Sequence, residues 1–144
     1  TDSSSKVVVF AWHQATIETI AEAYGDTCVK YYGNMTKRQK EKAREKFAQD
    51  ANVKVFVANI QSAGTGLDGL QLTACKCIFA ELPWGFVDLF QAVDRLHRMG
   101  QNRPVQADVL VLDSTVDNHM VSLITNKHKH FSDLHVDKVS PLAQ

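Results

Sequence analysis

The sequence predicts an α/β fold in which a doubly wound parallel sheet carries helices on both faces. Short continuous apolar runs at residues 6–11 and 53–58 are typical of buried strands. Segments with helical spacing alternate with such runs, and this alternation indicates crossover units and hence parallel strands. The 144 residues, of which 44% are hydrophobic, are enough for one domain with a core and too few for two.

In the first half of the chain, a strand over residues 6–11 leads to a helix over residues 16–24, where apolar residues recur at helical spacing. A Gly-Asp pair ends that helix, and a short second strand follows at residues 27–31. Thr36 is the expected N-cap of a charged helix that runs to about residue 47. Residues 53–58 form the third strand.

In the second half, strands are expected at residues 76–80 and 105–112, with a helix over residues 86–99 between them. Ser114 or Thr115 caps a last helix that runs to about residue 130. The expected boundaries are a polar leader at 1–5, one lobe including the terminal helix at 6–135, and a loose tail at 136–144.

The overall charge does not indicate a dedicated nucleic-acid binder, because sixteen basic and sixteen acidic residues give a net charge of zero. The distribution is uneven. Residues 37–46 hold six basic and two acidic side chains and form a locally positive helix. The same interleaving is also typical of an ordinary solvated helix face.

The three cysteines and six histidines show no zinc-ligand spacing, so no structural metal is expected and the cysteines are interpreted as buried free thiols. No apolar run approaches the ~18 residues that a membrane span needs, so no membrane partner is expected. We therefore expect an intracellular protein, in the cytoplasm or nucleoid if it is bacterial or from a phage and in the nucleus if it is eukaryotic.

Two loops at the carboxyl ends of the predicted strands carry polar and glycine residues. Ligands of parallel sheets gather at these ends. The loop at residues 32–36 leads into the basic helix, whose free backbone amides suit a phosphate. The loop at residues 59–69 holds three glycines that allow close backbone approach. A Gly-x-Gly loop is, however, more often only a tight turn.

The run at residues 91–101 places Gln91, Arg95 and Arg98 four and three positions apart, on one face of a helix if the helix continues. Two guanidiniums ahead of a Gly-Gln turn suit the spread charge of a transferring phosphoryl group. The alternative is that both arginines are solvated helix charges, one of them paired with Asp94 or Asp88.

Together with the following Arg-Pro-Val, residues 91–101 resemble the last motif in the second RecA-like lobe of superfamily 2 helicases, and more narrowly of the SWI/SNF type. Residues 6–12, 32–47 and 55–74 resemble earlier motifs of that lobe, in the family's order. The resemblance covers residues 6–139. The stretch at residues 79–84 is similar to the annealing-helicase subgroup and its bacterial or phage relatives.

The resemblance implies one lobe of an ATP-dependent translocase on double-stranded DNA. ATP with Mg²⁺ would be bound mainly by a first RecA-like lobe of the same polypeptide, because this sequence holds no Walker loop and no acidic box. The lobe alone is expected to be inactive. Arg98 would be the arginine finger, Arg95 its partner and Gln91 a nucleotide sensor.

The remaining implied contacts fall into two groups. The residues implied at the nucleotide, besides the two arginines, are Gly64, Gly66 and Asp68. The residues implied at the DNA backbone are Gly33, Asn34, Thr36, Lys37, Arg38, Ser62 and Thr65. Contacts of this kind predict binding that is independent of base sequence and dependent on salt.

One departure from the family and three alternatives stay open. The family loop reads Gly-x-Gly-Leu-Asn-Leu, whereas this chain has Asp68 in the Asn place and about two added residues, which leaves the role of Asp68 open. The chain would also suit a strand-separating DNA or RNA helicase, or a DNA-binding or interaction module without ATPase activity. The least specific alternative is another kind of nucleotide-binding α/β domain.

Overall fold

The computed structural model describes residues 6–64, 67, 69–81, 86–112 and 134–139. Its strands form one sheet in the order β2-β3-β1-β4-β5-β6, and every neighbouring pair is parallel. The strands are β1 (Val7–Ala11), β2 (Cys28–Tyr31), β3 (Val55–Asn59), β4 (Lys76–Phe79), β5 (Gln106–Leu112) and β6 (Leu134–Val139). The predicted parallel sheet is confirmed.

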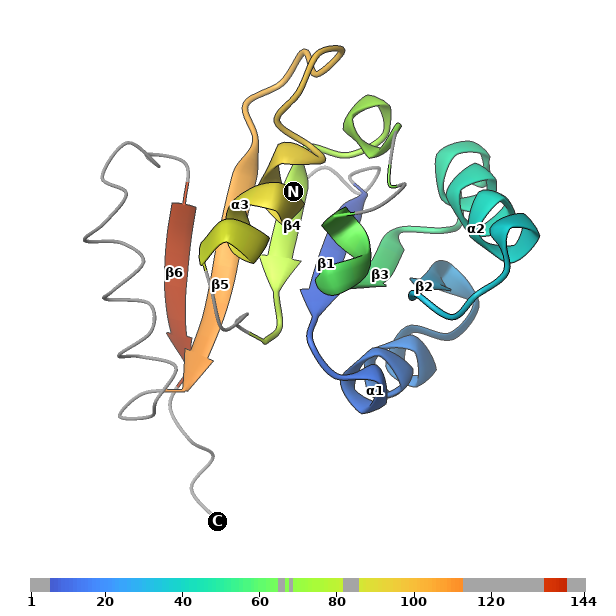
Figure 1. Cartoon of the computed structure of the whole chain (residues 1–144), viewed down its shortest axis with the longest axis horizontal. Coiled ribbons are helices and arrows are strands. Elements are labelled where there is room, and N and C mark those ends of the chain that lie inside the picture. Colours follow the sequence, from blue (N-terminus) through green and yellow to red (C-terminus); the bar gives the residue numbers. More distant parts are fainter. Residues whose placement is uncertain (1–5, 65–66, 68, 82–85, 113–133, 140–144) are drawn as a thin grey trace.

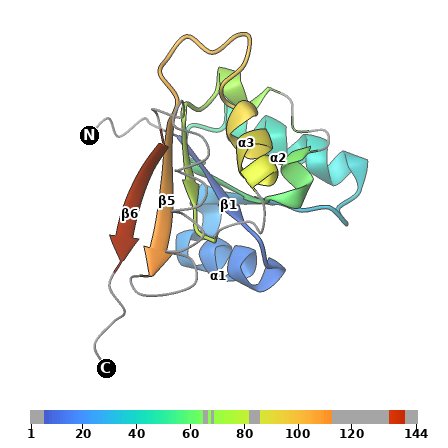
Figure 2. The ribbon, with the colours of Figure 1, turned by 60° about the vertical axis from the view of Figure 1, so that its left-hand side comes forward.

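Helices cover both faces of this sheet (Figure 1). The helix α1 (Gln14–Tyr24) packs on one face, where its Ile17 is buried with side chains of β1 and β3. The helices α2 (Lys37–Gln49) and α3 (Phe86–Asp94) lie together on the other face, as Figure 2 shows. Short 3₁₀ segments η1 (Gly25–Thr27), η2 (Gln61–Gly64) and η3 (Leu70–Leu72) complete the connections.

Both ends of α2 are fixed by side chains. Thr36 accepts a hydrogen bond from the backbone N–H of Gln39, and the Gln39 side chain accepts one from the N–H of Thr36. This capping box confirms the predicted N-cap. At the other end, Lys6 Nζ donates to the carbonyl oxygens of Phe47 and Asp50, so a cation lies at the negative end of the helix dipole.

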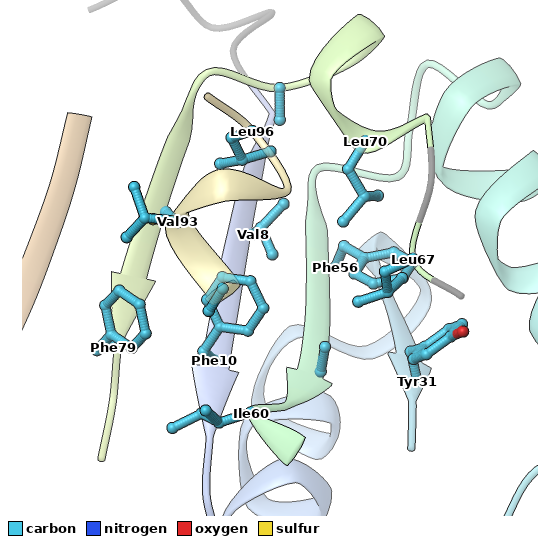
Figure 3. Close-up of a cluster of buried hydrophobic side chains, with 14 of the residues drawn as sticks. Val8, Phe10, Tyr31, Phe56, Ile60, Leu67, Leu70, Phe79, Val93 and Leu96 are labelled. Atoms are coloured by element: carbon cyan, nitrogen blue, oxygen red, sulfur yellow. The ribbon is translucent and has the colours of Figure 1, made fainter. Parts of the chain in front are cut away.

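The larger core lies between the sheet and the layer of α2 and α3 (Figure 3). Phe10 of β1 stacks on Phe79 of β4, with ring centroids 5.2 Å apart. Leu67, Leu70 and Leu96 reach the same core from connecting segments and are almost fully buried. Residues outside the regular elements therefore also help to fix the positions of the loops.

One boundary differs from the sequence expectation. A loose tail was expected from Val136, but β6 runs from Leu134 and pairs with β5 in the register Ala107↔Leu134. Residues 134–137 alternate apolar and polar types, which is the period of a strand. The predicted leader at 1–5 and the helix expected from Ser114 or Thr115 lie outside the described residues.

Candidate functional site

The loops that follow β1, β2 and β3 surround a hollow of about 310 Å³ at the carboxyl edge of the sheet. It is lined by Gln14, Tyr32, Gly33, Asn34, Asn59, Gln61 and Ser62. The structure thus brings together three of the predicted contact residues, Gly33, Asn34 and Ser62. A Cβ atom added to Gly33 would lie 3.5 Å from Ser62 Oγ, so the two loops are packed closely.

Uncharged carboxamide and hydroxyl groups supply the polar lining of this hollow. The Asn59 carboxamide holds the hollow together: its Nδ2 donates to the Trp12 carbonyl at 2.8 Å, and its Oδ1 accepts from the Gln61 N–H at 2.8 Å. Sequence reasoning missed Asn59 as a site residue, although its position directly after a strand was a usable signal. The exposed amides of Asn34 and Gln61 can donate to phosphate oxygens.

Glu81 joins the end of β4 to the start of α1. Its Oε1 accepts from the backbone N–H groups of Trp12 and His13, both at 2.9 Å, and its Oε2 lies 2.7 Å from His13 Nδ1. Partial burial raises the pKa of Glu81, but hydrogen bonds from His13, Thr16 and Trp12 together lower that pKa below its ordinary value. Sequence reasoning also missed this pair, whose members each follow a strand.

Two exposed cations follow the hollow along the chain. Asn34 lines the hollow, and α2 begins three residues later with Lys37 and Arg38 in its first turn. The Thr36 hydroxyl accepts from the Gln39 N–H at 3.2 Å, so its first role is to cap the helix. These cations add positive charge beside the positive end of the helix dipole. The predicted contact Thr65 lies outside the described residues.

The helix that carries Gln91 ends at Asp94, so the expectation of one helix over residues 86–99 is wrong. The N–H groups of Arg95 and Leu96 bond three residues back, to Ala92 and Val93, which tightens the chain into turns. Arg95 and Arg98 therefore lie beyond the regular helix that carries Gln91. Both arginines lie in what we call the arginine turn, residues 95–101, and both are partly buried.

The predicted Gly-Gln turn is confirmed. Gly100 has a φ of 98°, and the Gln101 N–H donates to the Arg98 carbonyl at 3.0 Å. Gln101 Nε2 also donates to the Ala74 carbonyl at 2.9 Å, just ahead of β4. The arginine turn thus lies at the amino edge of the sheet, opposite the carboxamide-lined hollow, and Figure 1 shows the loop between α3 and β5 beyond the start of these strands.

A second hollow, of about 380 Å³, adjoins the arginine turn. It is lined by His97, Arg98, Gln101, Arg103, Pro104 and Val105. Among the described residues, the lining of this hollow thus includes two guanidiniums and one imidazole and no carboxylate. This arrangement suits a polyanion such as a phosphate chain.

The segment at residues 61–72 connects the two edges. It begins with Gln61 and Ser62 at the carboxamide-lined hollow, and Gly64 ends η2. It finishes with η3, where Gln71 Nε2 donates to the Met99 carbonyl in the arginine turn. The predicted residues Gly66 and Asp68 lie outside the described residues.

Among the described residues, no three His, Cys, Asp or Glu side chains are grouped to hold a metal ion. Burial raises the pKa of the Cys77 thiol to about 12 and that of Cys28 to about 11. In the same part of the chain, no helix has the length and apolar character that crossing a membrane requires.

Residues 1–100 match the helicase conserved C-terminal domain family. The ATP-dependent helicase rhp16 of Schizosaccharomyces pombe is 30% identical over 131 residues, which cover 88% of this chain and 15% of that protein. The human DNA annealing helicase and endonuclease ZRANB3 is 30% identical over 129 residues, 88% of this chain and 12% of that protein. The chain therefore spans a small part of the length of such relatives.

A third relative carries the SWI/SNF name. The SWI/SNF-related matrix-associated actin-dependent regulator of chromatin subfamily A-like protein 1 of Xenopus tropicalis is 34% identical over 127 residues, 86% of this chain and 13% of that protein.

Solved structures share the fold. The C-terminal part of the Fun30 ATPase domain superposes with a TM-score of 0.76 at 21% identity, covering 85% of this chain and 40% of that one. The Sulfolobus solfataricus SWI2/SNF2 ATPase core domain superposes with a TM-score of 0.69 at 24% identity, covering 92% and 27%. The chain therefore belongs to the helicase conserved C-terminal domain family, and it shares its fold with solved SNF2-type ATPase domains.

Proposed function

We propose that this lobe supplies the arginine finger and part of the DNA-backbone contacts of an ATP-dependent translocase on double-stranded DNA. The observation that supports this most is the placement of two candidate contact surfaces at opposite edges of one sheet, connected by residues 61–72. A translocase needs separate binding sites for ATP and for DNA, together with a structural connection between the two sites.

On the nucleotide side, Arg98 is the proposed finger, Arg95 its partner on the γ-phosphate or the interlobe network, and Gln91 a sensor. A guanidinium placed against the transferring phosphoryl group stabilises the charge spread over its oxygens. The first lobe would hold the magnesium ion that neutralises charge on the phosphates, because the described residues of this lobe offer no carboxylate cluster. Gly64, Gly66 and Asp68 are proposed near the nucleotide as the resemblance implies.

On the DNA side, the carboxamide-lined hollow would accept phosphate oxygens through neutral donors, with Lys37 and Arg38 alongside. Contacts to phosphate carry no base information, so binding should not depend on base sequence. If ATP closes the cleft between two lobes and hydrolysis reopens it, a lobe that holds one DNA strand at the carboxyl edge of its sheet would advance along that DNA strand.

The test is DNA-stimulated ATPase activity of this chain joined to a first RecA-like lobe, which we call the two-lobe protein. Wild-type activity and an Arg98→Ala loss of about 10³-fold or more, with DNA affinity retained, would support the proposal. Equal loss of activity and DNA affinity would contradict the finger assignment. The matched control is Arg44→Ala, which changes an arginine on α2, away from the arginine turn.

A pair of strand assays separates the translocase from the alternatives. Displacement of a triplex strand without separation of a duplex would support translocation on double-stranded DNA. Duplex unwinding would instead indicate a strand-separating helicase, and DNA binding without any ATPase activity would indicate a binding module.

A further inference from the structure

We propose that Gln101 is a positioning residue that holds the arginine turn in the shape that presents Arg98 to a phosphate chain. This inference rests on the proposed role of Arg98 as the finger. It adds a residue to which that proposal gives no function.

The Gln101 side chain joins three separate parts of the chain. Its Nε2 donates to the carbonyl of Ala74 at 2.9 Å and to that of Leu96 at 3.2 Å. Its Oε1 accepts from the backbone N–H of Arg103 at 3.2 Å. The backbone N–H of Gln101 also donates to the Arg98 carbonyl. One residue therefore fixes the backbone on both sides of the hollow.

The partners of Gln101 are themselves firmly held. Ala74 and Leu96 are fully buried, and Leu96 belongs to the larger core. Gln101 thus connects this core to the Arg103 backbone through its carboxamide and to the Arg98 backbone through its own N–H, and the side chains of both arginines line the same hollow. Without this connection, the two guanidiniums would move relative to each other and to the core.

The chemistry at this position calls for a carboxamide. Two carbonyls face the nitrogen and one N–H faces the oxygen, so the side chain must both donate and accept at its tip. A glutamate keeps the acceptor but directs a second oxygen at the two carbonyls. A methionine keeps the length of the side chain and removes its three hydrogen bonds, which separates side-chain bonding from packing.

The experiment uses the two-lobe protein with Gln101→Met, Gln101→Glu and the exposed neighbour change Asn102→Ala as control. We expect both Gln101 variants to lower the DNA-stimulated kcat by about 10- to 100-fold, because a displacement of about 1 Å at a positioned group has this effect. The KM for ATP should change by no more than about twofold. Asn102→Ala should leave kcat unchanged.

A binding measurement adds a readout that does not depend on turnover. The Gln101 variants should bind ADP with aluminium fluoride more weakly than wild type and bind ADP alone equally well, since the finger acts on the mimic of the transferring group. If Gln101→Met does not fold, Gln101→Glu provides the same comparison. Equal weakening of the binding of ADP with aluminium fluoride and of ADP alone would overturn the inference.

A double-variant cycle connects Gln101 to Arg98. If Gln101 acts through Arg98, Arg98→Ala combined with Gln101→Met should be no slower than Arg98→Ala alone. Fully multiplicative losses would overturn the inference while leaving the finger assignment intact. If Arg98→Ala itself left kcat unchanged, the proposed function would fail instead.

Discussion

Gln71 donates a hydrogen bond from Nε2 to the Met99 carbonyl oxygen at 3.3 Å, across 28 positions of sequence. Beside this bond, a Cβ atom added to Gly100 would lie 3.1 Å from Leu72 Cδ2. The end of the segment at residues 61–72 and the arginine turn are thus packed directly against each other. A shift of η3 would therefore displace the backbone that carries Arg98.

Gly100→Ala should damage both stability and turnover. The φ of 98° strains any residue with a Cβ atom by about 1–3 kcal/mol, and the new methyl group would press on Leu72. We expect a lower free energy of unfolding in urea and a lower DNA-stimulated kcat of the two-lobe protein.

The matched control for this change is Gly25→Ala. Gly25 has a φ of 56°, but a Cβ atom there would meet nothing within 4 Å, and the residue lies at the end of α1. This variant should lose stability and keep kcat per folded molecule. An unchanged kcat in Gly100→Ala would show that the arginine turn tolerates displacement.

Thr36→Ala should destabilise the protein by about 0.5–2 kcal/mol, because it removes the hydroxyl that caps α2. Thr36→Ser keeps that hydroxyl and should lose much less of the free energy of unfolding. Urea unfolding of the three proteins measures the difference. Equal stability of Thr36→Ala and Thr36→Ser would mean that the capping box contributes little.

Lys37→Ala and Arg38→Ala should each reduce the salt dependence of DNA binding. Each phosphate contact by a cation contributes a slope of about −0.9 in log K against log salt, so the double variant should lose about 1.8. Titration of duplex DNA with the two-lobe protein at several salt concentrations measures this slope. Lys42→Ala, exposed on the same helix, is the control and should keep the wild-type slope.

Asn34→Ala should weaken DNA binding by a similar factor at every salt concentration. Its carboxamide is uncharged and lines the hollow, so its loss releases no counterion. A change of slope in Asn34→Ala would contradict a direct, neutral contact.

Glu81→Gln should lower the free energy of unfolding near neutral pH and lower it less in acid. The pKa of Glu81 is below its ordinary value of 4.5 in the folded protein, so its contribution is full above that value and is lost as the pH falls through the folded pKa. Urea unfolding of wild type and variant at several pH values should show the gap closing in acid. Glu22→Gln, exposed on α1, should show no such gap.

Local sequence signals predicted the strands β1 to β5, but not β6, and the gathering of Gly33, Asn34 and Ser62, because apolar runs and carboxyl-edge loops follow from adjacent residues. The end of α3 could not be predicted in this way. Leu89, Val93 and Leu96 continue the helical spacing beyond Asp94, and all three are buried. The N–H groups of Arg95 and Leu96 bond three residues back there, and the Leu96 carbonyl accepts from Gln101 Nε2, which also donates to the distant Ala74 carbonyl.

Sequence reasoning also missed the placement of the two candidate surfaces at opposite edges, although the predicted crossover was a usable signal. A helix between two parallel strands runs back along the sheet, so α3 brings the arginine turn to the amino edge. Gln71 was missed because its partner, Met99, is far away in sequence. Such pairings are set by tertiary packing.

The position of β1 also has a consequence for biosynthesis. Among the strands of this sheet β1 comes first in the chain, yet it lies in the interior of the sheet, where Val7 is aligned with Val55 on one side and with Lys76 on the other. At about 5–20 residues per second, the ribosome delivers these partners only after several seconds. During that interval both edges of the nascent segment Val7–Ala11 lack their partner strands, and unpaired edges of an apolar strand are sites where other chains can pair.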